Sequence, residues 1–130
     1  MTQSNSEITR GAYDAFANGD VEAVFAVFAE DISWRIPGEH LVSGDYKGHG
    51  EVAGFFERLG ELTDGTFRVQ VHDILESDSG AVAALTTISG DRNGRHGSFE
   101  TVQLWQFQDG KATSFHEFHD RQADLNAFWS

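Results

Sequence analysis

The chain has 130 residues, which is enough for one domain spanning residues 1–130 and too few for two. Its 21 Asp and Glu residues against 9 Lys and Arg give a net charge of −12, which disfavours nucleic acids and anionic membranes as partners. No cysteine is present and no apolar run approaches the roughly 18 residues of a membrane span, so disulfides and thiolate chemistry are excluded and a soluble, cytoplasmic protein is expected.

Two short helices are predicted at the N-terminal end. Ser4 and Glu7 form a capping box ahead of apolar residues at helical spacing. The first helix ends at Gly19, and Asp20 caps a second helix whose apolar stripe runs as far as Phe28. The break at Gly19 predicts that the two helices meet in an L or V arrangement.

The rest of the chain is predicted to form a strand, a third helix and then a run of strands. Residues 32–36 alternate apolar and polar up to Pro37, and a glycine-rich loop over 38–50 leads into a helix with one aromatic face. Further strands, separated by hairpin turns, are expected over 67–72, 81–89, 98–107 and 113–119. This order predicts a cone-shaped α+β domain, in which three N-terminal helices pack on a curved mixed or antiparallel sheet that encloses one pocket.

Five short motifs occur in one order along the chain. They are AFANGD at 15–20, FAEDISW at 28–34, PG at 37–38, G-x-x-x-G at 44–48 and WxFxDGK at 105–111. With them the chain resembles the nuclear transport factor 2-like superfamily, and within it the SnoaL-like, ketosteroid isomerase-related proteins, from about residue 7 to the end. The resemblance implies the fold but not one activity, because this fold carries isomerases, cyclases, epoxide hydrolases, dehydratases and scaffolds without activity.

Strand parity sorts the side chains of each strand into two faces, and the resemblance implies which strand faces and which helix residues are turned towards the pocket. Gln103 on the long strand and Glu117 and His119 on the last strand would be its polar groups. The expected substrate-binding wall is apolar and consists of Phe16, Trp34, Ile36, Phe55, Phe56, Trp105 and Phe107. The opposite face of the long strand carries Val102 and Leu104, and we expect a homodimer through this outer face of the sheet.

The resemblance argues against an authentic ketosteroid isomerase. It places Ile36 where those enzymes carry their carboxylate base and Gln103 where they carry an oxyanion-binding aspartic acid. Ala12 and Phe56 stand at the positions of the catalytic and the supporting tyrosine, and Tyr13 lies one residue out of register. All four groups that ketosteroid isomerases use are therefore replaced in this chain.

The SnoaL-type cyclases instead pair a polar group on the long strand with an acid or base on the last strand, and here these positions hold Gln103 and His119. We therefore predict a cofactor-free isomerase or cyclase acting next to a carbonyl group of an apolar ligand. His119 would move the proton, Gln103 would donate to the developing enolate, and Glu117 would orient the imidazole and raise its pKa. Asp120 is the alternative if a bulge shifts the parity.

Other interpretations stay open. His119 can instead be a structural residue, and Glu117 can form a salt bridge with an arginine at the rim of the sheet. The protein can be a ligand-binding or scaffold protein without activity. It can also be an epoxide hydrolase, although parity places no arginine in the pocket, or a dehydratase with a His–Asp pair. No metal is expected, because the rings of His116 and His119 point apart on a strand.

The C-terminal segment 123–129 carries Leu125, Phe128 and Trp129 at helical spacing. These side chains are expected to close the mouth of the pocket, to contact the partner subunit or simply to pack against the sheet.

Overall fold

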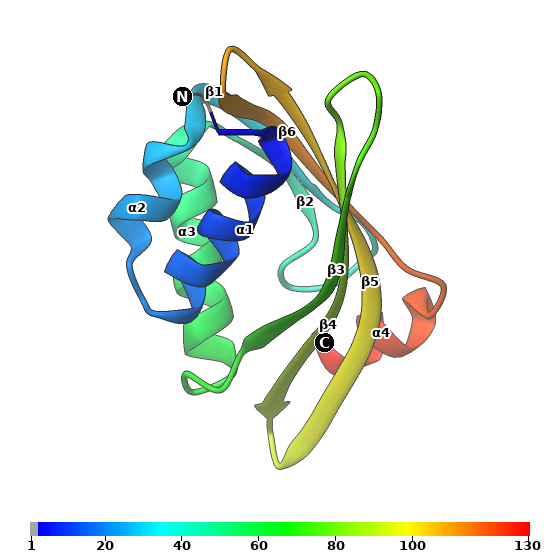
Figure 1. The fold of residues 1–130 in the computed structure, drawn as a ribbon. Helices are drawn as coiled ribbons and strands as arrows, with labels where there is room; N and C mark the ends of the chain where they lie inside the picture. Colours follow the sequence, from blue (N-terminus) through cyan, green and yellow to red (C-terminus); the bar gives the residue numbers. More distant parts are fainter. Residues whose placement is uncertain (1–2) are drawn as a thin grey trace.

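Helices α1 (Asn5–Ala17), α2 (Val21–Ala26) and α3 (Gly48–Leu62) lie together on one side of a curved six-stranded sheet in the computed structural model, which describes residues 3–130 (Figure 1). A fourth helix, α4 (Gln122–Phe128), follows the last strand. The capping box at the start of α1 forms as predicted, since Glu7 N–H donates to Ser4 and Ser4 N–H donates to Glu7. The predicted α+β architecture is confirmed.

The sheet is mixed, with strand order β2-β1-β6-β5-β4-β3. Its strands are β1 (Phe28–Ile36), β2 (Gly44–Lys47), β3 (Arg68–Glu76), β4 (Val82–Arg92), β5 (Arg95–Gln108) and β6 (Lys111–Phe118). Strand β1 runs parallel to β6, whereas every other neighbouring pair is antiparallel. Two hairpin turns place Asn93 and Asp109 at positive φ before a glycine, which is the geometry that Asn-Gly and Asp-Gly pairs adopt in tight turns.

Two predictions about the first half of the chain are wrong. The second helix ends at Ala26, and Phe28 is the first residue of β1, where it pairs with Ala112 and is almost fully buried. The loop expected over 38–50 contains strand β2, which pairs with β1. In both places hydrogen bonding to a partner strand decides the conformation, and that partner lies elsewhere in the sequence.

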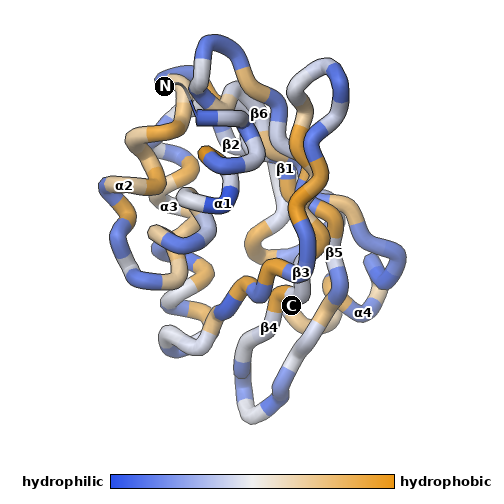
Figure 2. The backbone as a smooth tube through the Cα atoms, in the orientation of Figure 1, coloured by the Kyte–Doolittle hydropathy of each residue, from blue (hydrophilic) through white to orange (hydrophobic). Residues whose placement is uncertain are grey.

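The buried core lies between the helices and the concave face of the sheet. It includes Val24 of α2, Val52 and Phe55 of α3, and Trp34 and Trp105 of the sheet. Figure 2 shows hydrophobic residues along the strands and hydrophilic residues at the tip of the β4–β5 hairpin. Within residues 3–130, no helix combines the length and the apolar character that crossing a membrane requires.

Candidate functional site

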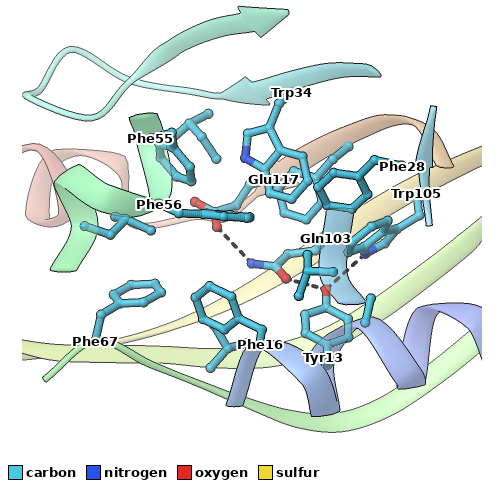
Figure 3. Close-up of a pocket in the computed structure, with 16 residues that line it drawn as sticks. Tyr13, Phe16, Phe28, Trp34, Phe55, Phe56, Phe67, Gln103, Trp105 and Glu117 are labelled. Carbon is cyan, nitrogen blue, oxygen red and sulfur yellow. Dashed lines mark hydrogen bonds between the residues drawn. The ribbon is translucent and has the colours of Figure 1, made fainter. Parts of the chain in front are cut away.

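A small cavity opens between the helices and the concave face of the sheet. Its free volume is about 60 Å³, and nine aromatic side chains contribute to its wall (Figure 3). The wall consists of Ala12, Tyr13, Phe16, Val24, Phe28, Trp34, Ile36, Phe55, Phe56, Leu59, Phe67, Val69, Gln103, Trp105, Phe115 and Glu117. A buried cavity with this wall has a low effective dielectric, so each of its few polar atoms interacts strongly with a charge.

Six of the seven apolar side chains expected at the substrate lie in this wall, and Phe107 does not. The pairing of β5 with β6 shifts between Gln106 and Phe107, so strand parity fails beyond that point. The Phe107 ring instead stacks on Trp105, with ring centroids 6.4 Å apart. The prediction for Phe107 therefore fails because of a bulge that the sequence does not reveal.

Tyr13 also lines the cavity, although the sequence did not predict it there. Its hydroxyl accepts a hydrogen bond of 3.0 Å from Trp105 Nε1 and donates one to Gln103 Oε1. An indole N–H can only donate, so the tyrosine must give its own hydrogen to the amide oxygen. Burial raises the pKa of Tyr13 far above its ordinary value, which keeps the hydroxyl protonated.

Gln103 continues this chain of hydrogen bonds to Glu117. Because its amide oxygen faces Tyr13, its amide nitrogen faces Glu117 and donates to Oε1 at 3.1 Å (Figure 3). The result is a chain of hydrogen-bonded groups in an aromatic cavity, which runs from Trp105 through Tyr13 and Gln103 to the carboxyl group of Glu117.

Glu117 is the titratable group at the end of this hydrogen-bonded chain. Its side chain is 7% exposed, and burial raises the pKa to about 7, with the hydrogen bond from Gln103 acting in the opposite direction. The expected salt bridge with an arginine is absent, because within residues 3–130 no arginine lies within 4 Å of this carboxyl group and none lines the cavity. The carboxyl group is therefore poised to exchange a proton near neutral pH.

His119 does not reach the cavity wall. Its side chain is 1% exposed, and its Nε2 lies 3.9 Å from Oε2 of Glu117, which is too long for a hydrogen bond. Within the described residues neither of its ring nitrogens has a hydrogen-bond partner. Burial lowers the pKa of His119, so the expectation that Glu117 raises it is wrong. Asp120 lies beyond the end of β6, is exposed and takes no part in the wall.

No cluster of three His, Asp or Glu side chains suited to a metal ion occurs in the part of the chain that the structure describes. The C-terminal helix packs instead of standing free, since Leu125, Phe128 and Trp129 are buried and Phe128 contacts Phe99 of β5.

Comparisons with known proteins fit this fold. The model of the SnoaL-like domain matches residues 9–115. An uncharacterized protein of Mycobacterium tuberculosis is 27% identical over 124 residues, which are 95% of each chain. The structure of Bal32a, from a soil-derived mobile gene cassette, is 29% identical with a TM-score of 0.94 over 97% of this chain and 96% of that one. An NTF2-like protein of unknown function from Burkholderia pseudomallei is 26% identical, with a TM-score of 0.86 over 98% and 99% of the chains.

Proposed function

We propose that this chain, which belongs to the SnoaL-like domain family, binds a small apolar carbonyl compound and moves a proton next to the carbonyl group without a cofactor. The observation that carries the proposal is Glu117, a carboxyl group with a pKa of about 7 in an otherwise aromatic cavity. A base with a pKa near the working pH is both available and strong enough to accept a proton.

The proton transfer assigns each polar group of the cavity a role. Gln103 holds Oε1 of Glu117, and no hydrogen bond within residues 3–130 occupies Oε2. As a carboxylate, Glu117 takes a proton from the carbon next to the carbonyl group, and the C–H electron pair forms the enolate. Return of the proton to another carbon completes an isomerisation. Attack of the enolate carbon on a second carbonyl group of the same molecule gives an alkoxide, and transfer of the proton from Glu117 to this alkoxide completes a cyclisation.

The size of the cavity limits the ligand. An engineered apolar cavity of about 150 Å³ takes up benzene, whereas the free volume here is about 60 Å³. We therefore propose a ligand no larger than one ring, which enters as the phenylalanine side chains of the wall adjust. A polycyclic substrate would require the helices to move away from the sheet.

His119 keeps a secondary role in this proposal as a relay behind Glu117. It is the titratable side chain next to Oε2, at a distance of 3.9 Å from that oxygen. A proton taken up by Glu117 passes to His119 when a small movement brings Nε2 and Oε2 within hydrogen-bonding distance. Replacing His119 by Gln should then slow the exchange of this proton with solvent while leaving ligand binding unchanged.

The direct test is hydrogen–deuterium exchange of 2-cyclohexen-1-one in deuterated buffer, followed by proton NMR. The protein should speed exchange of the protons next to and conjugated with the carbonyl group, and the rate should rise with pH up to about 7 and then level off. Glu117→Gln should return the rate to that of buffer, whereas Glu100→Gln, which removes an exposed carboxylate from β5, should not change it. An unaltered rate in Glu117→Gln, or no acceleration by the wild type, refutes the proposal.

A second candidate is a ligand-binding protein without activity. It is favoured by Gln103, the expected donor to an enolate, because the protein already engages its amide oxygen and one amide hydrogen. This alternative predicts that a small apolar molecule stays bound through purification, is identified by mass spectrometry and undergoes no exchange.

A homodimer through the outer face of the sheet is part of the proposal. Val102 and Phe118 pair across β5 and β6 on that face, and their exposed fractions are 38% and 44%. Apolar side chains exposed side by side are typical of an interface. Val102→Lys should convert a dimer into a monomer in sedimentation velocity experiments, and an unchanged sedimentation coefficient would contradict this surface.

A further inference from the structure

Trp34 carries a polar group that the proposed chemistry has not used. Trp34 is 5% exposed and lines the cavity, and its Nε1–H is buried without an acceptor anywhere in residues 3–130. Buried N–H groups are nearly always paired in native proteins, so an unpaired one in a cavity wall points to an acceptor that arrives with a ligand. Trp105 lines the same cavity and shows the usual situation, because its Nε1–H donates to Tyr13.

The packing around Trp34 fixes the direction of this N–H. The indole is stacked on Phe115, with ring centroids 3.8 Å apart and planes 7° apart. Phe56 and Trp105 pack nearly perpendicular to it, at 88° and 87°. With neighbours on several sides, the ring cannot turn to find an acceptor in the protein. Figure 3 shows its nitrogen on the edge of the indole that faces the carboxyl group of Glu117.

The other polar groups of the cavity are largely engaged with one another. Tyr13 gives its hydrogen to Gln103, and Gln103 gives one amide hydrogen to Glu117. When Glu117 is the carboxylate that acts as base, two donors remain for a ligand, the indole N–H of Trp34 and the second amide hydrogen of Gln103. The first is fully unpaired and held rigidly, whereas the second belongs to a group that already makes two hydrogen bonds.

We infer that Trp34 Nε1–H binds the carbonyl oxygen of the ligand, so that the cavity takes a flat carbonyl compound between this donor and Glu117. A donor held in place before the ligand arrives stabilises negative charge on that oxygen without reorganisation, which is what an enolate requires. The inference rests on the proposed function for the proton transfer, but its binding part stands on the unpaired donor alone. It changes the expected assignment, in which Gln103 served as the donor.

The test uses NMR spectra of the ¹⁵N-labelled protein, which report indole and glutamine N–H groups together. Two probes of similar shape are titrated in, 2-cyclohexen-1-one with the carbonyl group and cyclohexene without it. The indole proton of Trp34, assigned by its loss in Trp34→Phe, should shift downfield with the ketone and move much less with cyclohexene. A shift of the Gln103 amide protons in place of the indole proton, or equal responses to the two probes, would overturn the inference.

Affinities provide a second readout that tolerates a change in cavity size. Trp34→Phe should reduce the preference for the ketone over cyclohexene about tenfold, because one buried hydrogen bond is lost. Using the ratio removes the effect of the space that the smaller ring leaves. An unchanged ratio in a variant that keeps its circular dichroism spectrum would overturn the inference.

The two proposals fail separately. A downfield shift of the Trp34 indole without any deuterium exchange would support the binding site and refute Glu117 as a base. Exchange that requires Glu117 but leaves the Trp34 indole unmoved would support the base and refute the donor. Glu117→Gln should therefore keep the indole shift with 2-cyclohexen-1-one while it loses the exchange.

Discussion

Replacing Glu117 by Gln should stabilise the protein at alkaline pH more than at acidic pH. In the folded protein the pKa of Glu117 is about 7, against 4.5 for an unburied glutamic acid. One pKa unit corresponds to about 1.4 kcal/mol, so the ionised carboxylate lowers the free energy of unfolding by about 3 kcal/mol once both states are ionised. Glutamine has nearly the same shape, can still accept the hydrogen bond from Gln103 and carries no charge.

The direction of this pH dependence of stability follows from proton uptake by Glu117. Between pH 4.5 and pH 7 the folded state holds a proton on Glu117 that the unfolded state has released, so the stability of the wild type falls as the pH rises through this window. From pH 5 to pH 8 the difference in unfolding free energy, variant minus wild type, should therefore grow by about 2–3 kcal/mol.

Urea titrations followed by tryptophan fluorescence measure this difference at each pH. Glu100→Gln is the matched control, because it removes one carboxylate from the exposed side of β5. Its difference from the wild type should vary much less with pH. A difference for Glu117→Gln that stays constant between pH 5 and pH 8 would refute the raised pKa and with it the poised base.

Three further predictions concern the surroundings of the cavity. Tyr13→Phe should lower the free energy of unfolding, measured by urea titration, by about 1–3 kcal/mol, because it leaves buried hydrogen-bonding groups of two neighbours unpaired. Unchanged stability would contradict the hydrogen-bonded chain. Gly97→Ala should destabilise by about 1–3 kcal/mol and speed amide hydrogen exchange in α4, since the added Cβ would lie 2.6 Å from the Phe128 ring. His119→Leu should make stability less sensitive to acid, because the lowered pKa of the histidine gives stability that is present above pH 6.5 and is lost as the pH falls. Equal acid sensitivity of the variant and the wild type, in urea titrations at pH 5 and pH 7, would show that His119 titrates normally.

The local parts of the fold could be predicted well because their signals lie in a few adjacent residues. The Ser4–Glu7 capping box and the Asn93 and Asp109 turns each need only neighbours in sequence. The sequence does not predict that Phe28 begins a strand, because its apolar character suits a helix stripe and a strand equally. Its pairing with Ala112 depends on a segment more than 80 residues away.

The candidate site also has features that the sequence predicts and features that it does not. Gln103 and Glu117 line one cavity, because alternation along each strand sorts its side chains by face and the family resemblance indicated which face is concave. Strand parity does not predict the bulge at Phe107, and it does not predict that Tyr13 contacts Gln103 from a helix 90 residues away. It also could not tell that His119 would be buried behind Glu117.

An acidic α+β chain with an aromatic interior can be predicted from the sequence, because composition, periodicity and turn residues act locally. Which carboxyl group has its pKa raised towards neutrality, and which donor is left unpaired, depends on the tertiary structure. Both properties arise from desolvation and from the geometry of hydrogen bonds between distant segments. The raised pKa of Glu117 and the unpaired N–H of Trp34 are both consequences of the cavity in which the two side chains lie.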